Sequence, residues 1–196
     1  MRAFIVSVLA IMAALLSACA PTSVTAQYDV WDGPIEKLSI TVENTRRGLL
    51  EFVSDDELYP LAVSAVLNNS YATERFDLVD SRDVADCDYK IVIRFVNGTF
   101  SDVRPPSVGF GSAQINASGK MIAVDLTGRL VSCRTGRVLL SKSSHGTFFH
   151  LGDVGLGYQQ IMSTPKAEQI MEGTITASKR ALEDLIKSLM LELSRE

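Results

Sequence analysis

The pattern of apolar and polar residues divides the chain into an apolar leader, an aperiodic stretch and one domain. Residues 4–16 form an almost unbroken apolar run, and residues 20–34 show no period. From Leu38 onward, apolar and polar residues alternate as far as Glu43. Alternation with a period of two is typical of a half-buried strand. We therefore expect a first strand near the start of a single domain that covers residues 35–196.

A first helix is predicted after this strand. Ser54 to Glu57 matches a capping box, and the apolar residues that follow recur at helical spacing as far as Val66. Pro60 interrupts the pattern, because a proline inside a helix removes a hydrogen bond at a cost of about 3 kcal/mol. We therefore expect the regular helix to start at Pro60, with this residue in its first turn, and to end near Asn68 or Asn69.

Four further strands and a second helix complete the domain. The strands are predicted at residues 76–80, 89–96, 121–132 and 138–144, and Arg134-Thr135-Gly136 between the last two fits a tight hairpin turn. The final helix is marked from Ala177 to Leu193 by one apolar stripe, and an earlier start near Thr164-Pro165 is left open. The prediction is an α+β fold in which a mostly antiparallel meander is packed by two main helices.

The leader is typical of a lipoprotein signal peptide. Arg2 precedes the apolar run, which is shorter than the roughly 20 residues of a membrane-spanning helix. Leu16-Ser17-Ala18-Cys19 has the form of a lipobox. We predict a signal peptide over residues 1–18, fatty acylation at Cys19 including palmitate, and a linker over residues 19–34. An ordinary secretory signal cut near Ala18 or Ala26 is the alternative.

The residue after Cys19 indicates in which membrane the protein is anchored, and the charge of the chain indicates which classes of partner to expect. Ala20 takes the place of an aspartate, and this favours the outer membrane, with the domain facing the periplasm. The chain carries a formal net charge of -4, and its lysines and arginines are scattered. A basic stripe with interleaved aromatic residues is the signature of nucleic-acid binding. Because the sequence lacks one, we expect no nucleic-acid partner.

The remaining two cysteines, Cys87 and Cys133, predict a disulfide, because thiols in an oxidising compartment tend to pair. They flank strands that should run side by side. In a regular ladder, however, the apolar pattern places odd residues inward on one strand and even residues inward on the other, which points the two cysteines to opposite faces. We therefore predict a bulge at Gly128 that shifts the phase.

Two glycine-containing excursions interrupt the predicted strands, at residues 101–119 and 152–157. The first carries the apolar residues Val108, Phe110 and Ile115, which we predict to contact a membrane or a partner. Alternation of Ala113, Ile115 and Ala117 with polar residues would also suit a pore-lining strand, which needs about 9–11 such residues.

Residues that could support catalysis do not form a recognised site. His145 and His150 would need a third ligand such as Asp153 to hold a metal ion. The serines near His145 lack a nucleophile elbow, and the glycine-rich segments match neither a dinucleotide fingerprint nor a phosphate loop. We predict no catalytic residues, no cofactor and no metal.

Four segments resemble the family of the curli secretion channel lipoprotein and its smaller relatives, which include flagellar outer-membrane lipoproteins and penicillin-binding-protein activators. They are Lys37 to Asn44, Ala65 to Asp80, Ala85 to Ile93, and Ile122 to Leu139 with its Thr-Gly turn. The resemblance implies the same fold in the cell envelope. The chain departs from the family in being shorter than the channel protein, in lacking a helix-rich piece between the second and third strands, and in its short linker.

Three functions of different class follow. The first is a non-catalytic interaction or assembly factor in envelope biogenesis or secretion, with an envelope protein or a second copy as partner. The second is a subunit of an oligomeric outer-membrane secretion pore. The third is a small-ligand carrier or an enzyme whose site the sequence does not reveal.

Overall fold

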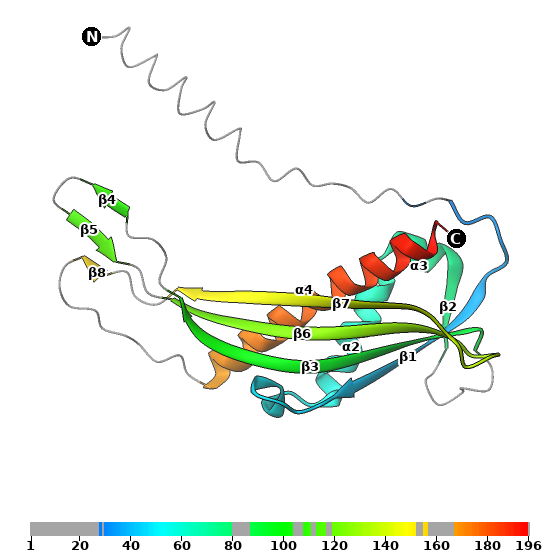
Figure 1. Cartoon of the computed structure of the whole chain (residues 1–196), viewed down its shortest axis with the longest axis horizontal. Coiled ribbons are helices and arrows are strands. Elements are labelled where there is room, and N and C mark those ends of the chain that lie inside the picture. The colour runs from blue at the N-terminus through cyan, green and yellow to red at the C-terminus, as the bar shows by residue number, and fades with distance from the viewer. Residues whose placement is uncertain are drawn as a thin grey trace, which may run out of the picture.

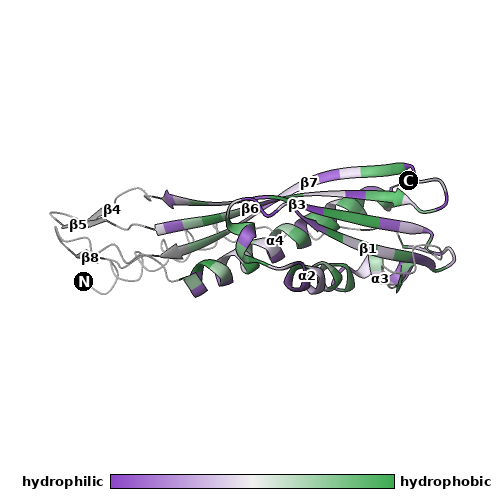
Figure 2. Ribbon diagram, turned by 90° about the horizontal axis from the view of Figure 1, so that it is seen from below, coloured by the Kyte–Doolittle hydropathy of each residue, from purple (hydrophilic) through white to green (hydrophobic). Residues whose placement is uncertain are grey.

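The fold was analysed in a computed structural model that describes residues 28, 30–79, 87–103, 108–110, 113–116, 119–151, 155–156 and 167–195. The predicted signal peptide and Cys19 lie outside these residues. A five-stranded sheet forms one layer and the helices form the other, all on one face of the sheet (Figures 1 and 2). The predicted α+β class, with a mostly antiparallel sheet packed by two main helices, is confirmed.

The main sheet has the strand order β2-β1-β3-β6-β7. Its strands are β1 (Glu36–Asn44), β2 (Phe76–Val79), β3 (Tyr89–Val103), β6 (Gly119–Ser132) and β7 (Val138–Leu151). The meander is β3-β6-β7, with antiparallel neighbours. By contrast, β1 pairs in parallel with both β2 and β3. Parallel neighbours need a crossover, and the helices between β1 and β2 supply it.

The helical layer consists of η1 (Leu49–Phe52), α2 (Asp55–Leu67), α3 (Ser70–Arg75) and α4 (Ala167–Leu193). Between this layer and the sheet lies one continuous apolar core. The stripe predicted for the last helix faces it, because Ala181, Leu185 and Leu189 are fully buried. None of the helices in the described part of the chain is long and apolar enough to cross a membrane.

The first main helix begins earlier than predicted. α2 starts at Asp55, and Pro60 lies inside it. The capping box is present, with the N–H and the hydroxyl of Ser54 both donating to Glu57 Oε2 at 2.8 Å. Three carboxylates in the first turn add a favourable interaction with the helix dipole. These contacts support helical geometry before Pro60, so the predicted start at Pro60 is wrong.

The predicted bulge at Gly128 is also wrong. β3 and β6 pair regularly there, with Ile93 opposite Gly128, and the register shifts instead between Phe95 and Asn97. Gly128 has another role, because a Cβ atom at this position would lie 2.8 Å from Leu185 Cδ2 of α4. The missing side chain lets the helix approach the sheet.

Two other glycines allow the same close approach of α4. A Cβ atom at Gly146 of β7 would lie 2.0 Å from the carbonyl oxygen of Ala177, and one at Gly173 of α4 would lie 2.5 Å from Ile122 Cδ1. Gly173 begins a stretch with poor helix propensity, yet the helix runs through it. Contacts with the sheet therefore extend α4 back to Ala167, ten residues before the start of the predicted stripe.

Candidate interaction surfaces

The disulfide predicted between Cys87 and Cys133 is present, with the Cα atoms 5.8 Å apart. No phase shift is needed to form it. The regular ladder ends at the pair Tyr89 and Ser132, and both cysteines lie beyond it, Cys133 in the hairpin turn. The N–H of Cys133 donates to the carbonyl of Asp88 at 2.9 Å, which holds the two chain ends together. Outside the ladder the strict alternation of faces no longer applies.

The predicted contact residues Val108, Phe110 and Ile115 meet in a second, smaller sheet. We call this sheet the arm; it consists of β4 (Val108–Phe110), β5 (Ala113–Asn116) and β8 (Gly155–Leu156). Val108 pairs with Ile115, and Phe110 pairs with Ala113. The arm lies beyond the far end of β3, β6 and β7 (Figure 1). Residues that the sequence placed in one excursion are therefore brought together.

Exposed apolar side chains lie near the arm ends of β3 and β7 and in the first turns of α4. Phe100, Phe149 and Met171 are exposed to between 37% and 40%. The ammonium group of Lys120 lies 5.3 Å from the centre of the Phe100 ring and forms an ion pair with Asp102. Phe149 belongs to the last three residues of β7, so it extends the apolar character of this end onto the main sheet.

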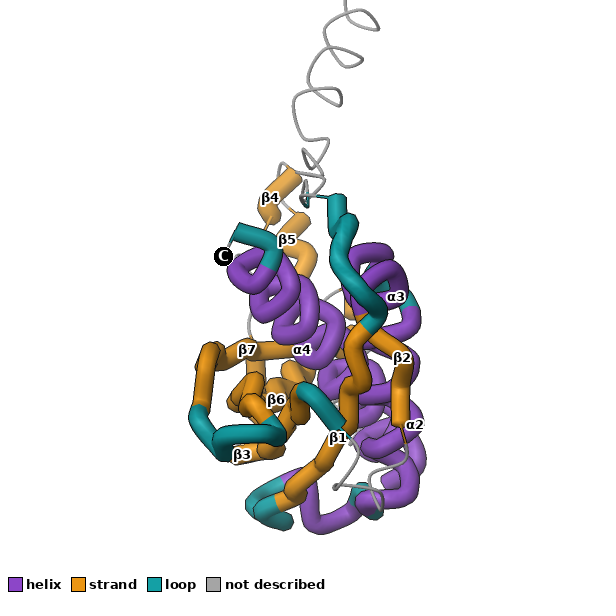
Figure 3. The backbone as a smooth tube through the Cα atoms, turned by 90° about the vertical axis from the view of Figure 1, so that its right-hand side faces the viewer, coloured by secondary structure: helices purple, strands orange, loops and turns teal. Residues whose placement is uncertain are grey.

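At the opposite end of the long strands, the residues before β1 pack against the domain. We call residues 28 and 30–35 the leash. Trp31 packs against the guanidinium of Arg75, whose Cζ lies 4.0 Å from the indole centre. Tyr28 stacks on Tyr71 with ring centres 5.7 Å apart, and its hydroxyl accepts from Asn69 Nδ2 at 2.8 Å. The end of the predicted linker is thus packed against the core, beside α3 (Figure 3).

Arg75 is the centre of this end and was not singled out by the sequence. It is only 7% exposed. Its Nε donates to Glu36 Oε2 at 2.7 Å and its Nη1 donates to the hydroxyl of Tyr71 at 2.9 Å. Burial by itself would lower the pKa of Arg75, but the hydrogen bonds and charges of Glu36 and Tyr71 raise it above its ordinary value. An arginine at the end of a six-residue helix gives no periodic signal, so only the packing reveals it.

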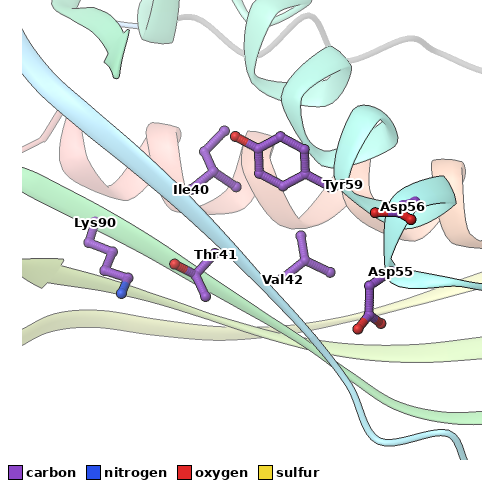
Figure 4. A pocket seen from close by; sticks show the side chains of 7 residues that line it. All are labelled: Ile40, Thr41, Val42, Asp55, Asp56, Tyr59 and Lys90. Carbon is purple, nitrogen blue, oxygen red and sulfur yellow. The ribbon is translucent and has the colours of Figure 1, made fainter. Parts of the chain in front are cut away.

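A groove of about 380 Å³ lies between β1 and the first turn of α2 (Figure 4). The sheet contributes Thr41 and Lys90, and α2 contributes Asp55, Asp56 and Tyr59. This mixture of a cation, carboxylates and hydroxyls could bind a polar ligand or a polar segment of a partner. Asp55 and Asp56 also belong to the helix start, which accounts for their position without a ligand.

His145, considered above as a possible metal ligand, lies within β7 of the main sheet. Nδ1 of His145 is 2.7 Å from Asp125 Oδ1 of the neighbouring strand, and both side chains are about half exposed. Because residues alternate between faces, and Val124 and Leu126 point into the core, this pair lies on the face opposite the helices. The described residues contain no group of three metal-ligating side chains, and the side chain of His150 and all of Asp153 lie outside them.

Comparison with protein-family models and with curated proteins finds no match. Among solved structures, the fold is similar to that of protein XCC0632 from Xanthomonas campestris, with 12% identity and a TM-score of 0.45 over 87% of this chain and 95% of that one. It is also similar to the PelC dodecamer from Paraburkholderia phytofirmans, with 8% identity and a TM-score of 0.42 over 83% and 94%. A minor lipoprotein from Acinetobacter baumannii gives 14% identity and a TM-score of 0.37 over 82% and 93%.

These likenesses concern the fold alone. The identities are far below 25% and the TM-scores below 0.5, so they do not assign the chain to the curli channel family or to any other family.

Proposed function

We propose that this chain is a lipoprotein of the bacterial envelope, anchored through Cys19 in the outer membrane, whose periplasmic domain is a non-catalytic interaction or assembly factor. The lipobox and Ala20 support the anchor and its membrane. The domain then begins within a short distance of the bilayer. Nine residue steps separate Cys19 from Tyr28, and a fully extended chain covers about 31 Å over that length.

One observation carries the proposed role: the leash and the arm lie at opposite ends of the long strands (Figure 1). β3 has 15 residues, and at about 3.3 Å per residue it covers roughly 50 Å. A domain tethered at one end therefore presents Val108, Phe110 and Ile115 at the other. Apolar residues on a separate small sheet are suited to contact with a partner.

The test uses the full chain in its own membrane. Cys19→Ala should abolish incorporation of labelled fatty acid and release the protein from membranes, and a variant that stays labelled would reject the anchor. In the anchored protein, Ile115→Lys should reduce the amount of envelope protein that co-purifies after crosslinking. Thr99→Lys, an exposed change on β3 outside the arm, is the matched control. Equal co-purification with both variants would reject the arm as the contact surface.

The pairing of Val108 with Ile115 also favours a second candidate, in which arms from many copies line a pore. In that case Ile115→Lys would place a charge near the bilayer midplane at a cost of about 2–4 kcal/mol. Native electrophoresis of detergent-extracted protein separates the two candidates. A large ring that Ile115→Lys disrupts indicates the pore, and a monomer or dimer indicates the interaction factor.

A further inference from the structure

We propose that the turn between β6 and β7, together with the leash, is a bilayer-contact surface that binds anionic lipid headgroups. We call Arg134, Arg137, Val138, Leu139 and the leash residue Val30 the turn surface. This inference deepens the proposed function, because it names the side of the domain that rests on the membrane and the chemistry that this side recognises.

The turn surface exposes apolar side chains that a soluble hairpin does not require. Val30 is 85% exposed, Val138 47% and Leu139 39%. Val30 and Leu139 line one groove of about 330 Å³, together with Trp31, Arg75 and Leu193. The leash and the turn therefore form one continuous surface, although they are more than 100 residues apart in the sequence.

The outward position of Val138 has a definite cause in the strand pairing. Leu130 pairs with Leu140, but the next residue, Val131, pairs with Val138, so Leu139 is left without a partner in the ladder. A bulge of this kind shifts the alternation of faces by one residue. Without it, regular alternation would place Val138 on the same face as Leu140, which is buried. The bulge instead places Val138 and Leu139 together at the surface.

The same turn carries two exposed cations. Arg134 and Arg137 flank Gly136, whose positive φ of 67° closes the hairpin, and both arginines are exposed. Neither side chain forms an ion pair within the part of the chain that the structure describes. The chain as a whole carries a net charge of -4. Two exposed arginines beside apolar residues are nevertheless complementary to the surface of a membrane that contains anionic lipids. Each arginine near such a membrane surface raises the binding constant about fivefold.

The chain path selects a bilayer as the partner. The leash leads toward Cys19, and the extended reach of about 31 Å keeps the turn surface close to the membrane that holds the lipid. Apolar residues bordered by cations are the composition that binds the headgroup region. A protein partner would instead be expected at the arm, which the tether leaves farther from the membrane.

Trp31 allows a direct test, because it is the only tryptophan and belongs to the leash. Protein extracted from membranes is reconstituted into brominated phosphatidylcholine vesicles, with and without phosphatidylglycerol. We expect quenching of Trp31 fluorescence to be stronger in the anionic vesicles. Arg134→Glu with Arg137→Glu should lower the ratio of docked to undocked protein by about 30-fold. Val138→Ser with Leu139→Ser should reduce quenching in both vesicle types.

The matched control is Arg94→Glu with Arg129→Glu, which makes the same change of charge at two exposed arginines of the main sheet. Quenching that does not respond to the turn variants, or that falls equally in the control, would overturn the proposal. Loss of a co-purified protein or of an oligomer in the turn variants, with quenching unchanged, would also overturn it. Fatty-acid labelling of the same samples tests the lipid anchor independently of the turn surface. If Cys19 is unlabelled but quenching still depends on the turn residues, the anchor is rejected and the bilayer-contact surface is supported.

Discussion

The two ends of the long sheet are stabilised by different interactions. At the leash end, the Cys87–Cys133 disulfide, the Arg75–Glu36 ion pair and the stacking of Trp31 on Arg75 join segments that are distant in the sequence. In the arm, the described backbone is held by pairing among β4, β5 and β8, which have three, four and two residues. Among the residues that the structure describes, these cross-links of high sequence separation lie at the leash end.

This difference shows how a small domain can expose apolar residues without losing its fold. The core between α4 and the sheet and the contacts at the leash end stabilise the domain. Exposed side chains near the arm, such as Phe100 and Phe149, are then expected to contribute little to stability. Changes at the leash end should therefore lower the free energy of unfolding, whereas comparable changes toward the arm should leave it almost unaltered.

The largest effect is expected from the disulfide. The bond joins residues 46 positions apart, and the chain-entropy argument assigns about 4 kcal/mol to a loop of that length. Replacing both cysteines by serine should lower the free energy of unfolding in urea by about that amount. A reductant should destabilise the original protein equally and leave the double variant unchanged. Insensitivity of the original protein to reductant would show that the bond is not formed.

A pair of glycine substitutions compares the covered sheet with its outer end. In Gly146→Ala the new Cβ atom meets the backbone oxygen of Ala177 at 2.0 Å, which cannot move without displacing α4. We expect a loss of about 3 kcal/mol. In Gly119→Ala the nearest atom, at 2.3 Å, is Phe149 Cζ, the end of an exposed and movable side chain. Here the loss should stay below about 1 kcal/mol. Equal melting temperatures for the two variants would contradict this distinction.

Loosening the leash should have an intermediate effect. Arg75→Ala leaves Glu36 without its partner and removes the contact with Trp31, and we expect a loss of about 2 kcal/mol. Arg75→Lys keeps the charge but not the two-sided hydrogen bonding, so it should recover only part of the loss. Faster hydrogen exchange should be confined to the leash and α3. Exchange that rises in the arm instead would show that the two ends are coupled.

The pKa of Arg75 also gives the sign of a pH effect at this end. Because its folded pKa is raised above the ordinary value of an arginine, its contribution to stability is complete below that ordinary value and is lost only as the pH rises through the folded one. The leash should therefore stay docked from mildly acidic to mildly alkaline solution. Trp31 fluorescence measured across that range should be constant, and a transition within it would contradict the assignment.

The smallest effect is expected at the start of α2. Hydrogen bonds from Ser54 lower the pKa of Glu57 below 4.5, so its contribution is present above that pH and is lost as the pH falls through the lower, folded value. Helix content is measured for the original protein and for Glu57→Gln during an acid titration. The two proteins should differ in helix content only in neutral solution. A difference that grows below pH 4.5 would contradict the capping role.

The elements of the fold were accessible from the sequence because their signals are local. Alternation from Leu38, the capping box at Ser54 and the apolar stripe from Ala177 each depend on neighbours within a few residues. The tight turn was predicted in the same way, because glycine readily adopts the left-handed backbone conformation that Gly136 has in the structure. The pairing of Cys87 with Cys133 was also correct, although the bulge at Gly128 that was meant to permit it was not.

Tertiary structure alone decided the features that join distant segments. The parallel pairing of β1, the docking of Trp31 on Arg75 and the early start of α4 depend on residues that no local window contains. Gly128 illustrates the reason. Its sequence context is equally consistent with a bulge and with a close helix contact, and only the position of Leu185 against it distinguishes the two. Periodicity determines which face of an element is buried, but the partner that buries it is fixed by packing across the whole chain.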